Sequence, residues 1–180
     1  MKLTGWRLNV VRGLVLAAVI AVTVVLFIYR NEVQKFGALG YPGIFFVSLF
    51  SNATLILPVP GVLFTSAMGA VFNPWWVALA AGTGATIGEL TGYLAGFSGQ
   101  AMIENKKWYE RVSGWMKKYG DITILVLAFV PNPIFDVAGM VAGALRLPVW
   151  RYLLMSWIGK VGKMLLFAFG GASILKIFGG

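Results

Sequence analysis

The sequence contains neither cysteine nor histidine among its 180 residues. These absences exclude thiol catalysis, disulfide bonds, zinc sites built on Cys or His, and His-based catalytic triads. Only six residues are Asp or Glu, which is too few for extensive acid–base chemistry. Because no nucleophile–base pair is visible, we expect no enzyme activity, no cofactor and no metal site.

Charge is also scarce. Charged residues make up 12% of the chain and hydrophobic residues 59%, with a mean hydropathy of +0.83. Soluble domains carry about 25% charged residues, so the composition indicates an integral membrane protein. The net charge of +9 is attributed to basic cytoplasmic loops and attraction to anionic lipid rather than to nucleic-acid binding.

Apolar runs divide the chain. The run 13–29 follows Lys2, Arg7 and Arg12 and is long enough to span a bilayer. We favour a retained anchor over a cleavable signal peptide, because no small-x-small cleavage site follows it. The predicted order is an N-terminal transmembrane helix and connector (1–39), then one domain (40–178) with a re-entrant hairpin (43–72), a transmembrane helix (75–97), an amphipathic helix (100–120), a second re-entrant hairpin (122–145) and a last transmembrane helix (150–175).

Two of these segments have clear helical faces. Gly84, Gly88, Gly92 and Gly96 recur every four residues, which places them on one face and permits close helix packing. In 100–120, one face carries aromatic and apolar residues and the other is mostly basic. This pattern is typical of a helix in the membrane interface, and a solvated cytoplasmic helix is the alternative. The apolar face consists of Trp108, Val112, Trp115 and Tyr119.

Prolines interrupt two apolar runs, at Pro58-Val59-Pro60-Gly61 and at Pro131-Asn132-Pro133. Proline disrupts a helix interior, and irregular backbone survives in a membrane only where protein or water satisfies it. We count the basic residues that flank the spans, with the N-terminus on the inner side. If both runs crossed the membrane, eight of these residues would lie on its outer side and five on its inner side. If both are re-entrant, ten lie inside and three outside. The positive-inside tendency therefore favours hairpins.

The chain also contains an internal repeat. The spacing of prolines, glycine and tryptophan in 58–76 recurs in 131–150, with an offset of 73 residues at the prolines and 74 afterwards. Because the first hairpin enters from outside and the second from inside, the repeats are inverted. Inverted repeats with broken helices are a transporter architecture. We therefore expect an all-α membrane protein built from two units, each a re-entrant hairpin followed by a transmembrane helix.

Four ionisable residues remain at membrane depth: Glu89, Asp136, Lys160 and Lys163. Each costs about 2.5–3.5 kcal/mol or more at a helix centre unless it is paired or hydrated. They either clamp the repeats together or form a polar cleft for a headgroup or ion. We expect Glu89 within reach of Lys163 or Lys160, and Asp136 close to the remaining lysine. Further candidates for lining this cleft are Tyr93, Asn52 and Asn132, although each asparagine could instead cap a broken helix.

Pro131 to Gly139 with Asp136, followed by Gly159-Lys160, resembles the VTT domain of the DedA and SNARE-associated Golgi protein superfamily, and within it the branch of vacuole membrane protein 1. The stretch 84–99 with Glu89 and Tyr93 resembles the family's Gly-acidic-x3-Tyr-x2-Gly motif. The resemblance covers about 40–175. It implies two re-entrant hairpins in inverted repeat, with lipid scrambling in the eukaryotic branch and undecaprenyl-phosphate or phospholipid translocation in bacterial members.

The sequence departs from the DedA pattern at two places. Val62 stands where that branch carries a glutamate, and Ala128 and Phe129 occupy the region of its arginine. Loss of the guanidinium argues against tight binding of a phosphate monoester.

We therefore expect translocation of membrane lipids between leaflets. An ion-coupled carrier of a small solute or lipid-linked phosphate, with Glu89 or Asp136 as the proton site, and a non-transporting assembly factor are the alternatives. The expected location is a prokaryotic plasma membrane with the N-terminus cytoplasmic, and self-association into a homo-oligomer is compatible with the sequence.

Overall fold

The computed structural model describes residues 40–53, 61–99, 106–131 and 134–178. These residues form helices and, within those ranges, no strand. The predicted N-terminal helix lies outside the described residues. The helices are α3 (Gly40–Ala53), α4 (Gly61–Val71), α5 (Pro74–Gly88), α6 (Leu90–Phe97), α7 (Lys106–Tyr119), α8 (Asp121–Phe129), α9 (Ile134–Ala144) and α10 (Val149–Phe178).

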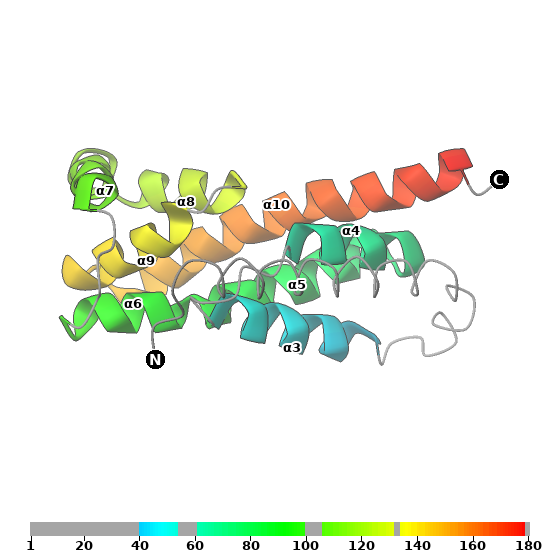
Figure 1. Ribbon diagram of the computed structural model, residues 1–180, viewed down its shortest axis with the longest axis horizontal. Coiled ribbons are helices and arrows are strands. Elements are labelled where there is room, and N and C mark those ends of the chain that lie inside the picture. Colours follow the sequence, from blue (N-terminus) through cyan, green and yellow to red (C-terminus); the bar gives the residue numbers. More distant parts are fainter. Residues whose placement is uncertain (1–39, 54–60, 100–105, 132–133, 179–180) are drawn as a thin grey trace, which may run out of the picture.

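Two long helical paths run side by side through the molecule, α10 and the succession of α5 and α6 (Figure 1). The pair α3 and α4 opens toward one end of the molecule, and the pair α8 and α9 opens toward the other (Figure 1). The first helix of each pair packs on the long path that follows it, α3 on α5 and α8 on α10. The second packs on the other path, α4 on α10 and α9 on α6. The two halves are thus interleaved rather than stacked as separate units.

Helix ends follow the local sequence. Asn73 accepts a hydrogen bond from the backbone N–H of Trp75 at 3.0 Å, and Pro74 occupies the first position of α5, where its missing N–H costs nothing. Gly120, with φ of 57°, separates α7 from α8. α8 ends just before Val130-Pro131, because proline cannot continue the helix and restricts the residue before it.

The expected uninterrupted helix 75–97 is divided at one residue, Glu89, which lies between α5 and α6. Its backbone remains in the right-handed helical region, with φ of −68° and ψ of −11°. The helix direction is therefore nearly preserved, and the backbone of Glu89 still donates to Ala85 at 3.2 Å and accepts from Tyr93 at 3.3 Å. The described part of the predicted amphipathic helix is 106–119.

The glycine-rich face of α5 and α6 packs closely against backbone, as its spacing predicts. A Cβ added at Gly84 would meet the carbonyl oxygen of Phe45, one at Gly88 that of Leu49, and one at Gly96 that of Met140. Gly92 is more open, with its nearest contact at 3.7 Å. Because lipid provides no hydrophobic drive for helix association, such close approaches supply the packing contacts that hold helices together.

The surface of the described fold is rich in large apolar side chains. Phe50, Ile122 and Trp150 are each more than 60% exposed, which a water-facing surface does not tolerate in such numbers. Among the described residues, one stretch is long and apolar enough to cross a bilayer, Val149–Ser173, with 25 residues and a mean hydropathy of 1.4.

Two adjacent glycines of α10 test this close packing. A Cβ at Gly171 would collide with the backbone of Ser66 in α4, whereas one at Gly170 meets nothing within 4 Å. We expect Gly171→Ala to lower the free energy of unfolding by about 1–3 kcal/mol, because the helices must separate. Gly170→Ala should leave it unchanged or raise it by up to about 1 kcal/mol. Unfolding in detergent with increasing dodecyl sulfate, followed by circular dichroism, measures both; equal effects would contradict the α4–α10 contact.

Candidate functional site

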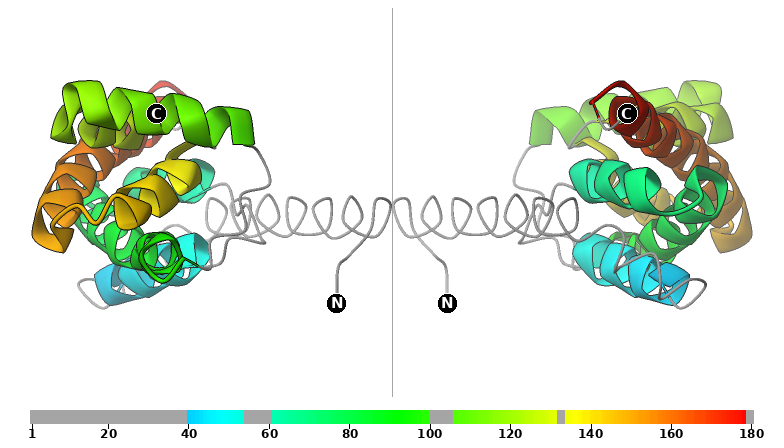
Figure 2. Two further views of the ribbon diagram at one scale, coloured as in Figure 1. Left: turned by 90° about the vertical axis from the view of Figure 1, so that its left-hand side faces the viewer. Right: turned by 90° about the vertical axis from the view of Figure 1, so that its right-hand side faces the viewer.

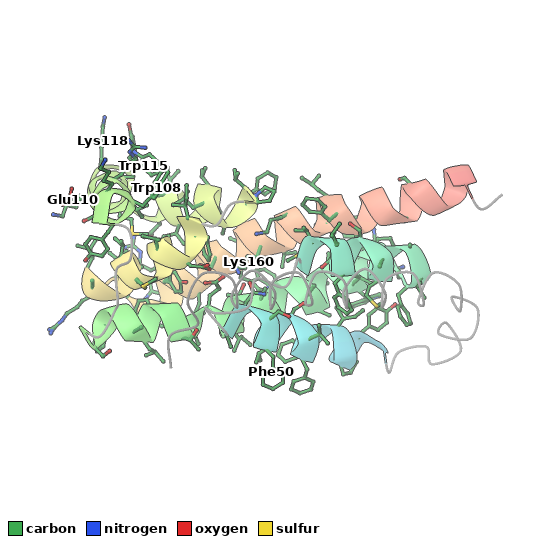
Figure 3. The ribbon with its side chains drawn as sticks, in the orientation of Figure 1. Phe50, Trp108, Glu110, Trp115, Lys118 and Lys160 are labelled. Atoms are coloured by element: carbon green, nitrogen blue, oxygen red, sulfur yellow. The ribbon has the colours of Figure 1, made fainter. Side chains whose placement is uncertain are left out.

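The centre of the molecule holds a buried ion pair between Glu89 and Lys160. The Lys160 ammonium lies 2.7 Å from Oε1 of Glu89 and also donates a hydrogen bond of 3.0 Å to Oδ1 of Asn52. Glu89 is 5% exposed and Lys160 2%. The ring of Phe135 contacts the ammonium from another side, with its centroid 4.9 Å away. Figure 3 labels Lys160 midway along the molecule, where both helix pairs reach inward.

Three parts of the chain position this pair. Glu89 sits at the break between α5 and α6, Lys160 near the middle of α10, and Asn52 in the last turn of α3. The amide nitrogen of Asn52 donates to the carbonyl oxygen of Ser48 at 2.8 Å, which leaves its side-chain oxygen turned toward the lysine. A buried charge is tolerated only when paired and hydrogen-bonded, and here each partner satisfies the other. The prediction that Glu89 pairs with one of the two lysines is confirmed, with Lys160.

Asp136 and Lys163 lie beside this pair but do not form a second one. Both are near enough to Glu89 and Lys160 for their charges to interact. Asp136, in the first turn of α9, is exposed on the described fold, and Lys163, one turn beyond Lys160, is half-buried. Within the described residues no ion pair joins them. The expectation that Asp136 lies close to the remaining lysine agrees with the interaction of their charges, and the structure has one closed pair and two neighbouring charges of opposite sign.

Tyr93 proves to be a structural contact rather than an open lining residue. Its ring is 5% exposed, and its hydroxyl donates to the carbonyl oxygen of Leu147 at 2.6 Å. It stacks on Tyr152 with ring centroids 5.2 Å apart. Tyr93 thus ties α6 to the turn between α9 and α10.

The predicted hairpin tips are described only in part. Pro58, Pro60, Asn132 and Pro133 lie outside the described residues. Gly61 begins α4 and has open space around it, and Pro131 is exposed after the end of α8.

Two buried hydroxyl groups of α10 were not anticipated. Tyr152 and Ser156 are both fully buried, and their hydroxyl groups lie beside each other without a further hydrogen-bond partner among the described residues. A Cβ placed on Gly139 would come within 2.9 Å of the Tyr152 hydroxyl, so this glycine makes room for it. Residues 152, 156 and 160 follow a spacing of four, which places them on one helical face; that stripe is the sequence signal that could have identified them.

Comparison with known proteins finds a matching family model and similar membrane proteins. A model of the VTT domain family matches residues 59–173. The chain is 30% identical to the inner membrane protein YqaA of Escherichia coli over 119 residues, covering 64% of this chain and 80% of YqaA. It is 34% identical to the vacuole membrane protein KMS2 of Arabidopsis thaliana over 98 residues, covering 44% of this chain and only 24% of KMS2. No solved structure matches.

The ion pair predicts a specific pattern of stability. Lys160→Met leaves Glu89 charged without a partner, and we expect a loss of about 3–5 kcal/mol in the free energy of unfolding. Glu89→Gln added to Lys160→Met should recover most of this loss, because no unpaired charge remains. Glu110→Gln, an exposed acid on α7, is the control and should change stability little. Detergent unfolding measures all three variants; a double variant no more stable than Lys160→Met alone would contradict the pairing.

Proposed function

This chain belongs to the VTT domain family of integral membrane proteins, and on that premise we propose that it moves phospholipids between the two leaflets of a bilayer. Lipid headgroups would cross through a polar cleft between two re-entrant hairpins while the acyl chains stay in the membrane. Membrane lipids are thus the proposed partners, and neither an enzyme activity nor nucleic-acid binding is proposed.

The observation that carries this proposal is the charged cluster at the middle of an apolar fold. Lys160 and Lys163 flank the centre of the apolar span Val149–Ser173. Charges at that depth are rare and usually line a path for ions or polar groups. The closed pair of Glu89 and Lys160 stabilises the contact between the two halves. Asp136 and Lys163, outside this pair and more accessible, are assigned to contact the cationic and phosphate parts of a passing headgroup.

Re-entrant geometry is part of the proposal, and the arrangement of the helix pairs supports it. Each pair returns toward the end from which it started, and the two open toward opposite ends (Figure 1). In a bilayer with α10 crossing it, each pair would enter and leave on one side. The first pair's entry helix brings Asn52 to the buried lysine of α10, so the break after α3 lies at the depth of the charges.

Corresponding glycine contacts support an inverted repeat. Gly69 of α4 faces the backbone of Ala168 in α10, and Gly143 of α9 faces the backbone of Tyr93 in α6. The two glycines are 74 residues apart in the sequence, and their two partners are 75 apart. Matching contacts, shifted by one residue at the partner, therefore occur twice with the units exchanged, which supports a two-fold axis between the units.

A further contact supports the position of such an axis. The indole N–H of Trp157 in α10 donates to the hydroxyl of Thr83 in α5 at 2.9 Å, across a sequence separation of 74. That separation equals the repeat offset, so each residue meets its own counterpart. Contacts of this kind arise where a two-fold axis passes between two elements. The proposed axis therefore runs between α5 and α10.

Ion-coupled transport is the second candidate, and the position of Asp136 favours it. This carboxylate has no ion-pair partner among the described residues and is exposed on the fold. A carboxylate that enters a membrane environment binds a proton more readily. Asp136 would then load a proton while a small solute or a lipid-linked phosphate, such as undecaprenyl phosphate, is carried. Glu89 is less suited to this role because it is buried and already bound to Lys160.

We also propose a plasma-membrane location with the N-terminus cytoplasmic, since this places the basic residues of 106–151 on the cytoplasmic side. The name of YqaA, an inner membrane protein, agrees with such a location. Homo-oligomer formation would be compatible with the exposed apolar surface.

Reconstituted vesicles test the translocation proposal. With a fluorescent phospholipid in both leaflets and an impermeant reductant outside, we expect quenching to proceed beyond the outer leaflet only when the protein is present. Lys163→Met should slow the quenching of inner-leaflet lipid about fivefold or more, because it removes one charge contact of about 1 kcal/mol. Glu110→Gln should not change the rate. Quenching that stops at the outer leaflet would overturn the proposal. Uptake of a substrate that ceases when a protonophore collapses the gradient would instead support the ion-coupled alternative.

A further inference from the structure

The structure contains an apolar cavity far from the central charges, between α7 and α8. It has a volume of about 340 Å³ and is lined by Trp115, Tyr119, Ile122, Thr123, Val126 and Leu127. Trp115, Tyr119, Ile122 and Val126 are also at least 36% exposed, so the cavity is open along one side. We call it the α7–α8 groove.

The groove has a fixed floor. The hydroxyl of Thr123 donates to the backbone carbonyl of Trp115 at 3.1 Å, which joins α8 to α7. Thr123 and Leu127 are buried at its base. Val112 and Met116, on the other side of α7, are buried in the core with α9 and hold the helix in place. The expected stripe of α7 is thus divided: Val112 enters the core, while Trp115 and Tyr119 flank the groove.

One end of the groove is basic. Lys117 and Lys118 form the last turn of α7, and the ammonium of Lys118 lies 5.0 Å from the centre of the Tyr119 ring that lines the groove. Asp121 begins α8 at the same end, but Arg151 holds it at 2.6 Å and offsets its charge. Figure 3 shows Lys118 and Trp115 extending from α7 at the end of the molecule.

The direction of the groove matches the orientation of a lipid. α7 lies across one end of the helix bundle (Figure 2), and α8 leads from there toward its middle (Figure 1). Along α8, the lining residues pass from Ile122 near the basic end to Val126 and Leu127 deeper in. An amphipathic basic helix is typical of the membrane interface, so the basic end would lie at headgroup level and the apolar part among acyl chains.

We propose that the α7–α8 groove is a binding site for one anionic phospholipid, with an acyl chain along α8 and the headgroup phosphate beside Lys117 and Lys118. The basic mouth and the apolar channel leading inward from it together fit an amphiphile with a negative head. The site is separate from the central charges, and its occupancy does not depend on lipid translocation.

Native mass spectrometry of the full chain in mild detergent tests this site, with phosphatidylglycerol and phosphatidylcholine of identical acyl chains as probes. We expect one phosphatidylglycerol to be retained in preference to phosphatidylcholine, with each lysine contributing about fivefold. Lys118→Gln should reduce this preference. Lys107→Gln, an exposed lysine near the other end of α7, makes the same change in net charge and should leave the preference intact.

A second variant separates the groove from the charge. Val126→Trp places an indole in the channel at a position already 50% exposed, so the fold should tolerate it, and we expect loss of the retained lipid. Ile158→Trp, at an exposed position on α10, should retain it. The proposal would be overturned if Lys118→Gln and Lys107→Gln changed the preference for phosphatidylglycerol equally. Retention of the lipid by Val126→Trp would also overturn it. So would dissociation of a dimer in Val126→Trp, which would assign the groove to a second copy of the chain.

Discussion

The ion pair between Glu89 and Lys160 is the interaction on which the rest of this structure depends. Two charges at the middle of an apolar fold are stable only if they meet each other and find hydrogen-bond partners. Glu89 comes from the break between α5 and α6, Lys160 from α10, and the amide oxygen of Asn52 from the end of α3. No part of the chain can satisfy these groups alone. The requirement to neutralise one carboxylate therefore fixes how the first helix pair and both long helical paths come together.

Close backbone packing makes this assembly feasible. Gly84 and Gly88 allow α3 to approach α5, and Gly159 does the same for α8 against α10. Without side chains at these positions, the helices lie close enough for Asn52 to reach the lysine. In lipid, exposure of apolar surface carries no penalty. The assembled helices are therefore more stable than separated ones because of these close contacts and the internal polar interactions. The polar cluster and the glycine contacts thus support one another, since neither would hold the helices alone.

Much of this arrangement could be predicted from the sequence. Charges within apolar runs predict pairing, glycines every four residues predict a close face, and prolines predict breaks. The choice between Lys160 and Lys163 could not be predicted, because they differ by one helical turn and the rotation of α10 depends on packing against α4, α5 and α8. The position of Tyr93 one turn after Glu89 predicts a residue that lines the cleft, but the carbonyl of Leu147 that binds its hydroxyl is 54 residues away in the sequence. The buried hydroxyls of Tyr152 and Ser156 were overlooked because each looks ordinary in a helix, and only their shared face with Lys160 marks them.

The hydrogen bond between Trp157 and Thr83 bears on the origin of such a chain. If the two units descend from one ancestral sequence that paired with itself, residues beside the axis would have met identical copies. A homodimer can place only Thr against Thr or Trp against Trp there, whereas fusion of two copies lets each diverge, and an indole donor now meets a hydroxyl acceptor. Glu89 and Lys163 stand at equivalent positions under the same offset, so a self-pairing ancestor would have carried like charges at both. On the proposed repeat, divergence of the two units therefore allows Glu89 and Lys163 to differ in charge, whereas the pair between Glu89 and Lys160 joins non-equivalent positions and needs no such divergence.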